Sequence, residues 1–137
     1  MKFKVQTEKP IVIEIEVDGQ TSEIKFYPTD TKVRQDFFEI YEEMKAYKPR
    51  EIVPVVDENG VSNADIEATR ELKRFTDFVA ERVDRVFGAG TSALLMNGGC
   101  YIHVLVRFIC ETAHYFKAAS SELIKEYTMP NESGVME

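Results

Sequence analysis

A chain of 137 residues is long enough for one domain with a hydrophobic core and too short for two, and its 44% hydrophobic and 30% charged residues are ordinary for a globular protein. The formal net charge of −7, without a run of Lys or Arg, argues against nucleic-acid binding and against an anionic membrane surface. No stretch of ~18 uncharged apolar residues predicts a transmembrane helix, and residues 1–8 lack the apolar centre of a signal peptide, so we expect a cytoplasmic protein.

Residues 1–28 predict a β-hairpin. Hydrophobic and acidic residues alternate over residues 11–17, which places the apolar side chains on one face of a strand. An Asp-Gly pair, a favoured two-residue hairpin turn, follows directly, and the return strand alternates in the same way. We expect Glu–Lys pairs across the outer face and a third strand around Phe3 and Val5. Because a lone hairpin is marginal, it must pack on helices or on another subunit.

A first helix is predicted over residues 31–48. The segment of residues 28–31 ends the hairpin and offers an N-cap, and apolar residues then recur at steps of four and three along one narrow stripe. Pro49 ends this helix. Residues 49–63 contain prolines, a glycine and acidic residues, which predicts a mobile loop.

Residues 64–127 are predicted to form the helical part of the domain. An amphipathic helix over residues 64–87 has Ser62 or Asn63 as its N-cap. We expect this helix to end at Gly88, with the glycine in the left-handed cap position.

A short helical turn and a long apolar helix complete the chain. Thr91 or Ser92 offers the N-cap of the turn, and the last helix is predicted over residues 100–127. The fold class is therefore α+β, mainly α-helical, with an N-terminal β-hairpin, three main helices and a short helical turn in a single domain of residues 1–128. Residues 129–137 are predicted to be a disordered tail.

The last predicted helix is apolar on most of its sides. Its broad face consists of Ile102, Leu105, Val106, Ile109, Ala113 and Phe116. A second apolar flank consists of Val104, Phe108 and Tyr115. A helix of this kind is either central in the core or shared with another subunit, and both are open here. We name the second flank as the candidate surface for self-association or client binding.

Cys100, His103, Cys110 and His114 are residue types found in zinc sites. On one helix, however, the first and the last lie about 21 Å apart along the axis, whereas zinc binds its ligands at about 2.0–2.3 Å. A metal would therefore need a second subunit, and we expect no metal and no cofactor, with the cysteines packing as small hydrophobic residues. A metal-dependent or redox protein that uses these four residues is an alternative function.

Residues 88–92, Gly-Ala-Gly-Thr-Ser, invite comparison with a phosphate-binding loop. A phosphate-binding P-loop requires a preceding strand and a Gly-Lys-Ser/Thr sequence, whereas here a helix precedes and no lysine follows. We interpret the segment as a tight turn between helices. No Gly-x-Ser-x-Gly motif or triad order is present, so we expect no catalytic residues and a protein that is not an enzyme.

The order of elements and one motif carry a resemblance to a known family. Residues 83–92, Val-Asp-Arg-Val-Phe-Gly-Ala-Gly-Thr-Ser, and the opening Ile-Glu-Ile-Glu-Val-Asp-Gly hairpin resemble the tail assembly chaperones of long-tailed, siphovirus-type bacteriophages, particularly those of Gram-positive hosts. In that family an aspartate-bearing helix runs into a Phe/Leu-Gly-x-Gly-Thr turn before the final helix. The matching residues, carried over as a structural turn, are Phe87, Gly88, Gly90 and Thr91.

The resemblance implies a non-enzymatic protein that forms homo-oligomers and binds the tape measure protein and the major tail protein during tail assembly. It further implies a location in the cytoplasm of the bacterial host and absence from the finished virion. The net charge of −7 leaves a different class open, namely an acidic inhibitor or adaptor that binds a basic protein surface.

Overall fold

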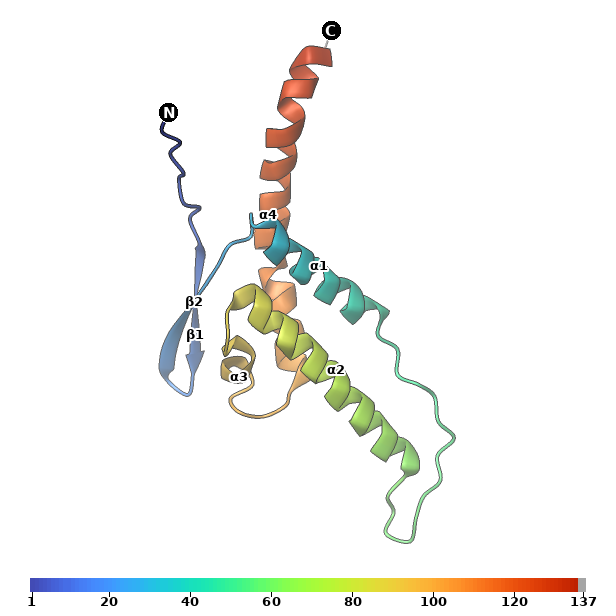
Figure 1. Cartoon of the computed structure of the whole chain (residues 1–137). Coiled ribbons are helices and arrows are strands. Elements are labelled where there is room, and N and C mark those ends of the chain that lie inside the picture. The colour runs from blue at the N-terminus through green and yellow to red at the C-terminus, as the bar shows by residue number, and fades with distance from the viewer. Residues whose placement is uncertain (136–137) are drawn as a thin grey trace.

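The computed structural model of the protein describes residues 1–135, with side chains described through Leu123. Within these residues a two-stranded antiparallel sheet is followed by helices (Figure 1), which confirms the predicted α+β, mainly α-helical class. The elements are β1 (Ile11–Val17), β2 (Gln20–Phe26), α1 (Thr31–Ala46), α2 (Asn63–Phe87), α3 (Thr91–Leu95) and α4 (Ile102–Val135). No helix in this described part of the chain has the length and apolar character needed to cross a membrane.

The hairpin forms because its turn and its alternating pattern agree. Asp18 (φ 50°) and Gly19 (φ 81°) both have positive φ, as in the two-residue turns that match the twist of paired strands. This turn pairs Ile13 with Ile24, so the apolar faces of the two strands coincide. Phe26, on the same face, is only 1% exposed, which places that face against the helices.

Two details of the predicted hairpin are wrong. The register places Glu14 opposite Glu23 and Val12 opposite Lys25, so no Glu–Lys pair lies directly across the outer face. The two-residue turn sets this offset, and the residue types on the strands do not alter it. Residues 1–10 contain no strand, because no turn before β1 folds this segment back onto an edge of the sheet.

The two long helices after the hairpin begin at predicted caps. The Asp30 carboxylate accepts a hydrogen bond from the backbone N of Lys32 at 2.9 Å, and the Ser62 hydroxyl accepts one from the backbone N of Ala64 at 3.1 Å. α1 ends at Ala46, slightly before the predicted boundary, since the following residue is already extended ahead of the proline.

The core lies where the hairpin, α1, α2 and α4 meet. The ring of Phe37 stacks on that of Phe116 with centroids 4.0 Å apart, and the ring of Phe26 also stacks on that of Phe116, with centroids 5.6 Å apart. Phe87 presents its ring edge-on to Phe26 and Phe108, at 4.8 Å from each. Burying each such side chain contributes roughly 1.5–3 kcal/mol, so these aromatic residues hold together four elements that are distant in sequence.

The last helix differs from its prediction at both ends. α4 begins at Ile102 and continues to Val135, past the predicted end at Tyr127. The predicted disordered tail is therefore helical up to Val135, while residues 136–137 lie outside the described residues. In Figure 1 the end of α4 projects beyond the other elements.

Candidate functional site

The family-motif turn joins α2 to α3 through two glycines with different conformations. Gly88 has φ +112° and ψ 149°, an extended region with positive φ that glycine alone adopts readily. Gly90 has φ +87° and ψ −5° and is the left-handed residue of the turn. The prediction of a left-handed cap at Gly88 is therefore wrong. The chain must first extend away from α2 before it reverses at Gly90 to begin α3.

Asp84, in the last turn of α2, belongs to the motif of residues 83–92, but its role as a cap was not predicted. Its carboxylate accepts hydrogen bonds from the backbone N of Ser92 at 2.8 Å and from the Ser92 hydroxyl at 3.0 Å. Ser92 lies in the first turn of α3, so Asp84 caps α3 from the neighbouring helix. A signal was available, because a carboxylate in the last turn of a helix is unfavourable for that helix and needs another partner.

The prediction that Thr91 or Ser92 is the N-cap of α3 is wrong, because α3 is capped from the neighbouring helix. The N-cap position is Gly90, which offers no side chain, and the carboxylate of Asp84 takes over that function for Ser92. The Thr91 hydroxyl instead donates to the carbonyl oxygen of Gly88 at 2.8 Å, which closes the turn from inside.

Two side chains of the motif are buried in the fold, and its two glycines are required by their backbone conformations. Phe87 (2% exposed) and Thr91 (4% exposed) point into the core. A side chain built on Gly88 would meet one atom at 3.9 Å, and one built on Gly90 would meet nothing within 4 Å. Backbone conformation, and not lack of space, is therefore the reason for both glycines.

The second apolar flank of α4 is partly buried, and a hollow of about 340 Å³ lies between it and the hairpin. Phe108 is 8% exposed and belongs to the core, and Tyr115 is partly buried with its ring 5.7 Å from that of Phe26. Val104 is also partly buried. The prediction that Val104, Phe108 and Tyr115 form an open partner surface is therefore wrong at Phe108, because this side chain packs into the core with its ring 4.8 Å from that of Phe87 in α2.

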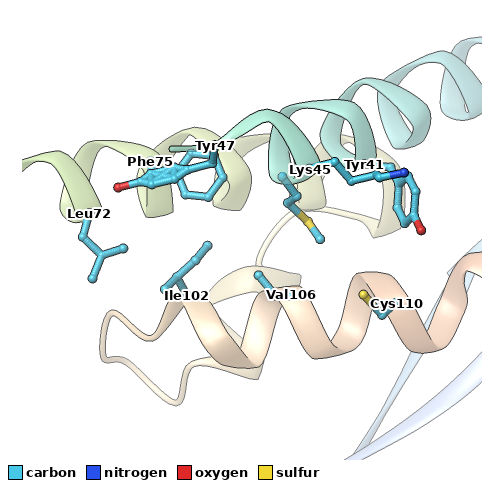
Figure 2. A pocket seen from close by; sticks show the side chains of 9 residues that line it. Tyr41, Lys45, Tyr47, Leu72, Phe75, Ile102, Val106 and Cys110 are labelled. Carbon is cyan, nitrogen blue, oxygen red and sulfur yellow. The ribbon is translucent and has the colours of Figure 1, made fainter. Parts of the chain in front are cut away.

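An open apolar surface instead lies between α4, α1 and α2 (Figure 2). One hollow of about 380 Å³ is lined by Tyr41, Met44, Lys45, Tyr47, Leu72, Phe75, Ile102, Val106 and Cys110. A second hollow of about 430 Å³ shares one of these residues and is lined by Phe37, Phe38, Tyr41, Ala113, His114, Lys117 and Ser120. Because the two hollows meet at Tyr41, we describe them together as the α1–α4 groove.

The groove exists because α1 is attached at its two ends to different helices. At its start, the Arg34 guanidinium donates to the carbonyl oxygen of Phe116 in α4 at 3.0 Å and also bonds the Ser120 hydroxyl, and its burial lowers the pKa of Arg34. At its end, the Tyr47 ring lies against Phe75 of α2, with centroids 4.1 Å apart. Between these points α1 diverges from α4 (Figure 1).

The side chains in the groove lining that carry a charge at neutral pH are lysines. They are Lys45 and Lys117, although the whole chain carries a formal net charge of −7. The Lys45 ammonium also lies 5.7 Å from the centroid of the Tyr41 ring. The groove therefore combines apolar walls with a local positive charge.

The cysteines and histidines of the possible zinc site are spread along the chain and not gathered. Cys100 lies before α4 and Cys110 lines the groove, and both thiols are free and exposed. His103 and His114 are exposed, and Nδ1 of His114 lies 2.9 Å from the carbonyl oxygen of Glu111. In the part of the chain that the structure describes, no group of three or more His, Cys, Asp or Glu side chains is placed to hold a metal ion.

Comparisons with protein-family models, characterised proteins and solved structures give no match for this chain. The features that bear on function are therefore the ones above, namely the capped glycine turn and the α1–α4 groove.

Proposed function

We propose that this protein is a non-enzymatic tail assembly chaperone of a long-tailed bacteriophage. In this proposal it self-associates and binds the tape measure protein and the major tail protein in the cytoplasm of the bacterial host, and it is absent from the finished virion. The starting point is the resemblance carried by residues 83–92 and the N-terminal hairpin. The capped glycine turn between α2 and α3 supports the structural role that this resemblance assigns to the motif.

The observation that carries the proposal is the amount of apolar surface that the single chain leaves open. The α1–α4 groove exposes large side chains, including Tyr41 (37% exposed) and Leu72 (44% exposed). Contiguous apolar surface of this kind marks a site of interaction with another protein. A chaperone that holds an aggregation-prone client needs such surface, and repetition of modest contacts along an oligomer supplies the affinity.

A second open apolar segment supports client binding specifically. The loop between α1 and α2 holds Val53 at 82% exposed, Val55 at 66% and Val56 at 61%. The backbone of this loop is held in place, since Val55 N donates to the Asn63 side chain at 2.6 Å and Asn63 N donates to the Val55 carbonyl oxygen at 3.0 Å. We assign this valine-rich loop segment, residues 53–56, to contact with the tape measure protein.

The test is co-expression of the full chain with its proposed client, a phage tape measure protein. We expect more tape measure protein in the soluble fraction and its co-purification with this protein. The double variant Val53→Ser/Val55→Ser should lower that recovery, because it removes apolar contact area without adding charge. The matched control is Val12→Ser on the outer face of the hairpin, where the native valine is 46% exposed.

Two outcomes would contradict the proposal. In one, the tape measure protein is equally insoluble with and without this protein, and neither it nor the major tail protein co-purifies. In the other, the captured material is dominated by a basic host enzyme, which would favour the acidic inhibitor or adaptor.

A further inference from the structure

We propose that residues 2–6 of one copy of this chain add a third strand to the free edge of β1 in a second copy. This contact deepens the proposed function and rests on it, because it is the contact through which the chaperone self-associates.

The edge of β1 that faces away from β2 is open. In the part of the chain that the structure describes, the sheet has two strands, so β1 has no partner on this side. The two-residue turn makes Val17 and Gln20 a hydrogen-bonded pair, and such pairs alternate along an antiparallel ladder. The backbone N–H and C=O groups of Val12, Glu14 and Glu16 therefore point outward from the sheet. An exposed row of such groups is a template for another strand.

Residues 2–6 have the sequence of a strand that lacks a partner. Phe3 is 80% exposed and Val5 is 77% exposed, and both alternate with the exposed residues Lys2 and Lys4. This alternation places the apolar side chains on one face of a strand and the lysines on the other. Within its own chain the segment forms no strand, so the two large apolar side chains remain in water.

A hollow at the free edge of β1 has room for these apolar side chains. Its volume is about 340 Å³, and Ile13 and Ile15 of β1 line it together with Leu95, Phe108 and polar residues of α4. None of its described lining residues belongs to β2, which places the hollow on the side where a third strand adds. An engineered cavity of about 150 Å³ holds a benzene molecule, so this hollow is large enough for the Phe3 ring.

The outer face of the hairpin carries charges that complement the two lysines. β1 has Glu14 and Glu16 on this face, and the register places Glu23 of β2 directly opposite Glu14. Like charges in such positions destabilise a sheet, and none of the ion pairs among the described residues involves these three glutamates. Lys25 lies opposite Val12, toward the other end of this face. Lysines on a strand beside β1 therefore offset an existing repulsion.

One antiparallel register pairs both lysines with glutamates. It places Lys4 opposite Glu14 and Lys2 opposite Glu16 on the outer face. The two apolar side chains of the segment then lie on the inner face, beside the hollow. A shift of the register by one residue turns the lysines toward the helices and the apolar side chains toward water.

This register is the same when the two copies exchange roles, so the contact occurs twice about a two-fold axis. Lys9 falls on the axis, next to Pro10, which lacks an N–H and interrupts the ladder there. The two exposed Lys9 side chains are thus free to turn apart. The exchange closes a pair of copies and leaves the α1–α4 groove open for a client.

The segment reaches the edge of another copy and not that of its own chain. Among the described residues before β1 none has a positive φ and none belongs to a turn, so the segment runs on in line from β1. The Thr29 hydroxyl donates a hydrogen bond to the Glu8 carboxylate at 2.8 Å, which attaches the segment to the residues that follow β2. Residues 2–6 therefore lie beyond the open end of the hairpin, away from its turn (Figure 1).

The first experiment cross-links the two strands in the full chain. In the proposed register, positions 5 and 13 form a pair without mutual hydrogen bonds, whose side chains are close enough for a disulfide. With the native thiols removed by Cys100→Ser/Cys110→Ser, the variant Val5→Cys/Ile13→Cys should form a disulfide-linked dimer under mild oxidation. The matched control Val5→Cys/Val12→Cys should form ~10-fold less, because position 12 lies on the opposite face. Equal dimer from both variants, or a disulfide within one chain, would overturn the inference.

The second experiment exchanges the charges in full-length protein and measures molar mass by light scattering. Lys2→Glu/Lys4→Glu and, separately, Glu14→Lys/Glu16→Lys should each weaken self-association by ~10-fold or more, because attractive pairs become repulsive in both contacts of the dimer. The combination of all four substitutions should restore self-association, since it reverses every pair.

Lys32→Glu/Lys48→Glu is the matched control for the lysine variant. Both lysines are exposed, lie outside the hairpin and change the net charge by the same amount, so this variant should keep the oligomer of the unmodified protein. Thermal unfolding of each variant checks that it is folded.

The outcomes separate this inference from the proposed function. If the charge variants keep the oligomer of the unmodified protein, or if that protein is monomeric throughout, the strand assignment is wrong even where the tape measure protein is captured. If the four-fold variant restores the oligomer but no tape measure protein is captured by any variant, the strand assignment stands and the chaperone proposal fails.

Discussion

Replacement of Asp84 by alanine tests whether this side chain caps α3 across the glycine turn. The carboxylate accepts two hydrogen bonds, from the backbone N and the hydroxyl of Ser92, at 2.8 and 3.0 Å. Loss of an N-cap costs about 1 kcal/mol, and a buried donor left without a partner costs about 1–3 kcal/mol. Ser92 is 6% exposed, so water replaces the carboxylate poorly. We expect Asp84→Ala to lower the free energy of unfolding by about 2 kcal/mol.

The assay is chemical denaturation of Asp84→Ala beside Asp84→Asn and Asp77→Ala. Asparagine caps about as well as aspartate, and its amide group is able to donate to the Ser92 hydroxyl, so Asp84→Asn should cost under about 1 kcal/mol. Asp77 lies on the same helix, is 60% exposed and pairs with Lys73 at 2.6 Å, so its replacement should cost about 0.5 kcal/mol or less. At about 4 °C per kcal/mol, Asp84→Ala should also lower the melting temperature by about 8 °C. If Asp84→Ala is no more destabilising than Asp77→Ala, the capping argument is refuted.

Two further predictions concern the turn and Phe108. Gly90→Asn should lower the free energy of unfolding by under about 1 kcal/mol, because asparagine tolerates the left-handed conformation. Gly88→Asn should lower it by about 1–3 kcal/mol, because φ +112° with ψ 149° suits only glycine. Denaturation curves that show Gly90→Asn as the less stable variant would contradict this. Phe108→Ala should lower the free energy of unfolding by about 3–5 kcal/mol, because Phe108 is a core phenylalanine. If the variant is as stable as the unmodified protein but differs in oligomeric state, Phe108 is an interface residue and not part of the core.

Local features were predictable where the determining groups are close in sequence. The hairpin turn at Asp18 and Gly19 and the N-caps at Asp30 and Ser62 depend on a few neighbouring residues, and the structure contains all of them. The different conformations of Gly88 and Gly90 were not predictable, because each glycine permits both and the position of α3 selects between them.

The candidate site depended on tertiary structure for a different reason. α4 is apolar on most sides, so its periodicity alone does not decide which flank another element covers. Phe87 of α2 packs against Phe108, while Arg34 and Tyr47 attach α1 at its two ends and leave the α1–α4 groove open between them. By itself, then, the sequence determined the fold class, the hairpin and the helix caps, because backbone conformation and capping act over a few residues. Only the tertiary structure decided which apolar surface is open, because that depends on packing between segments far apart in the chain.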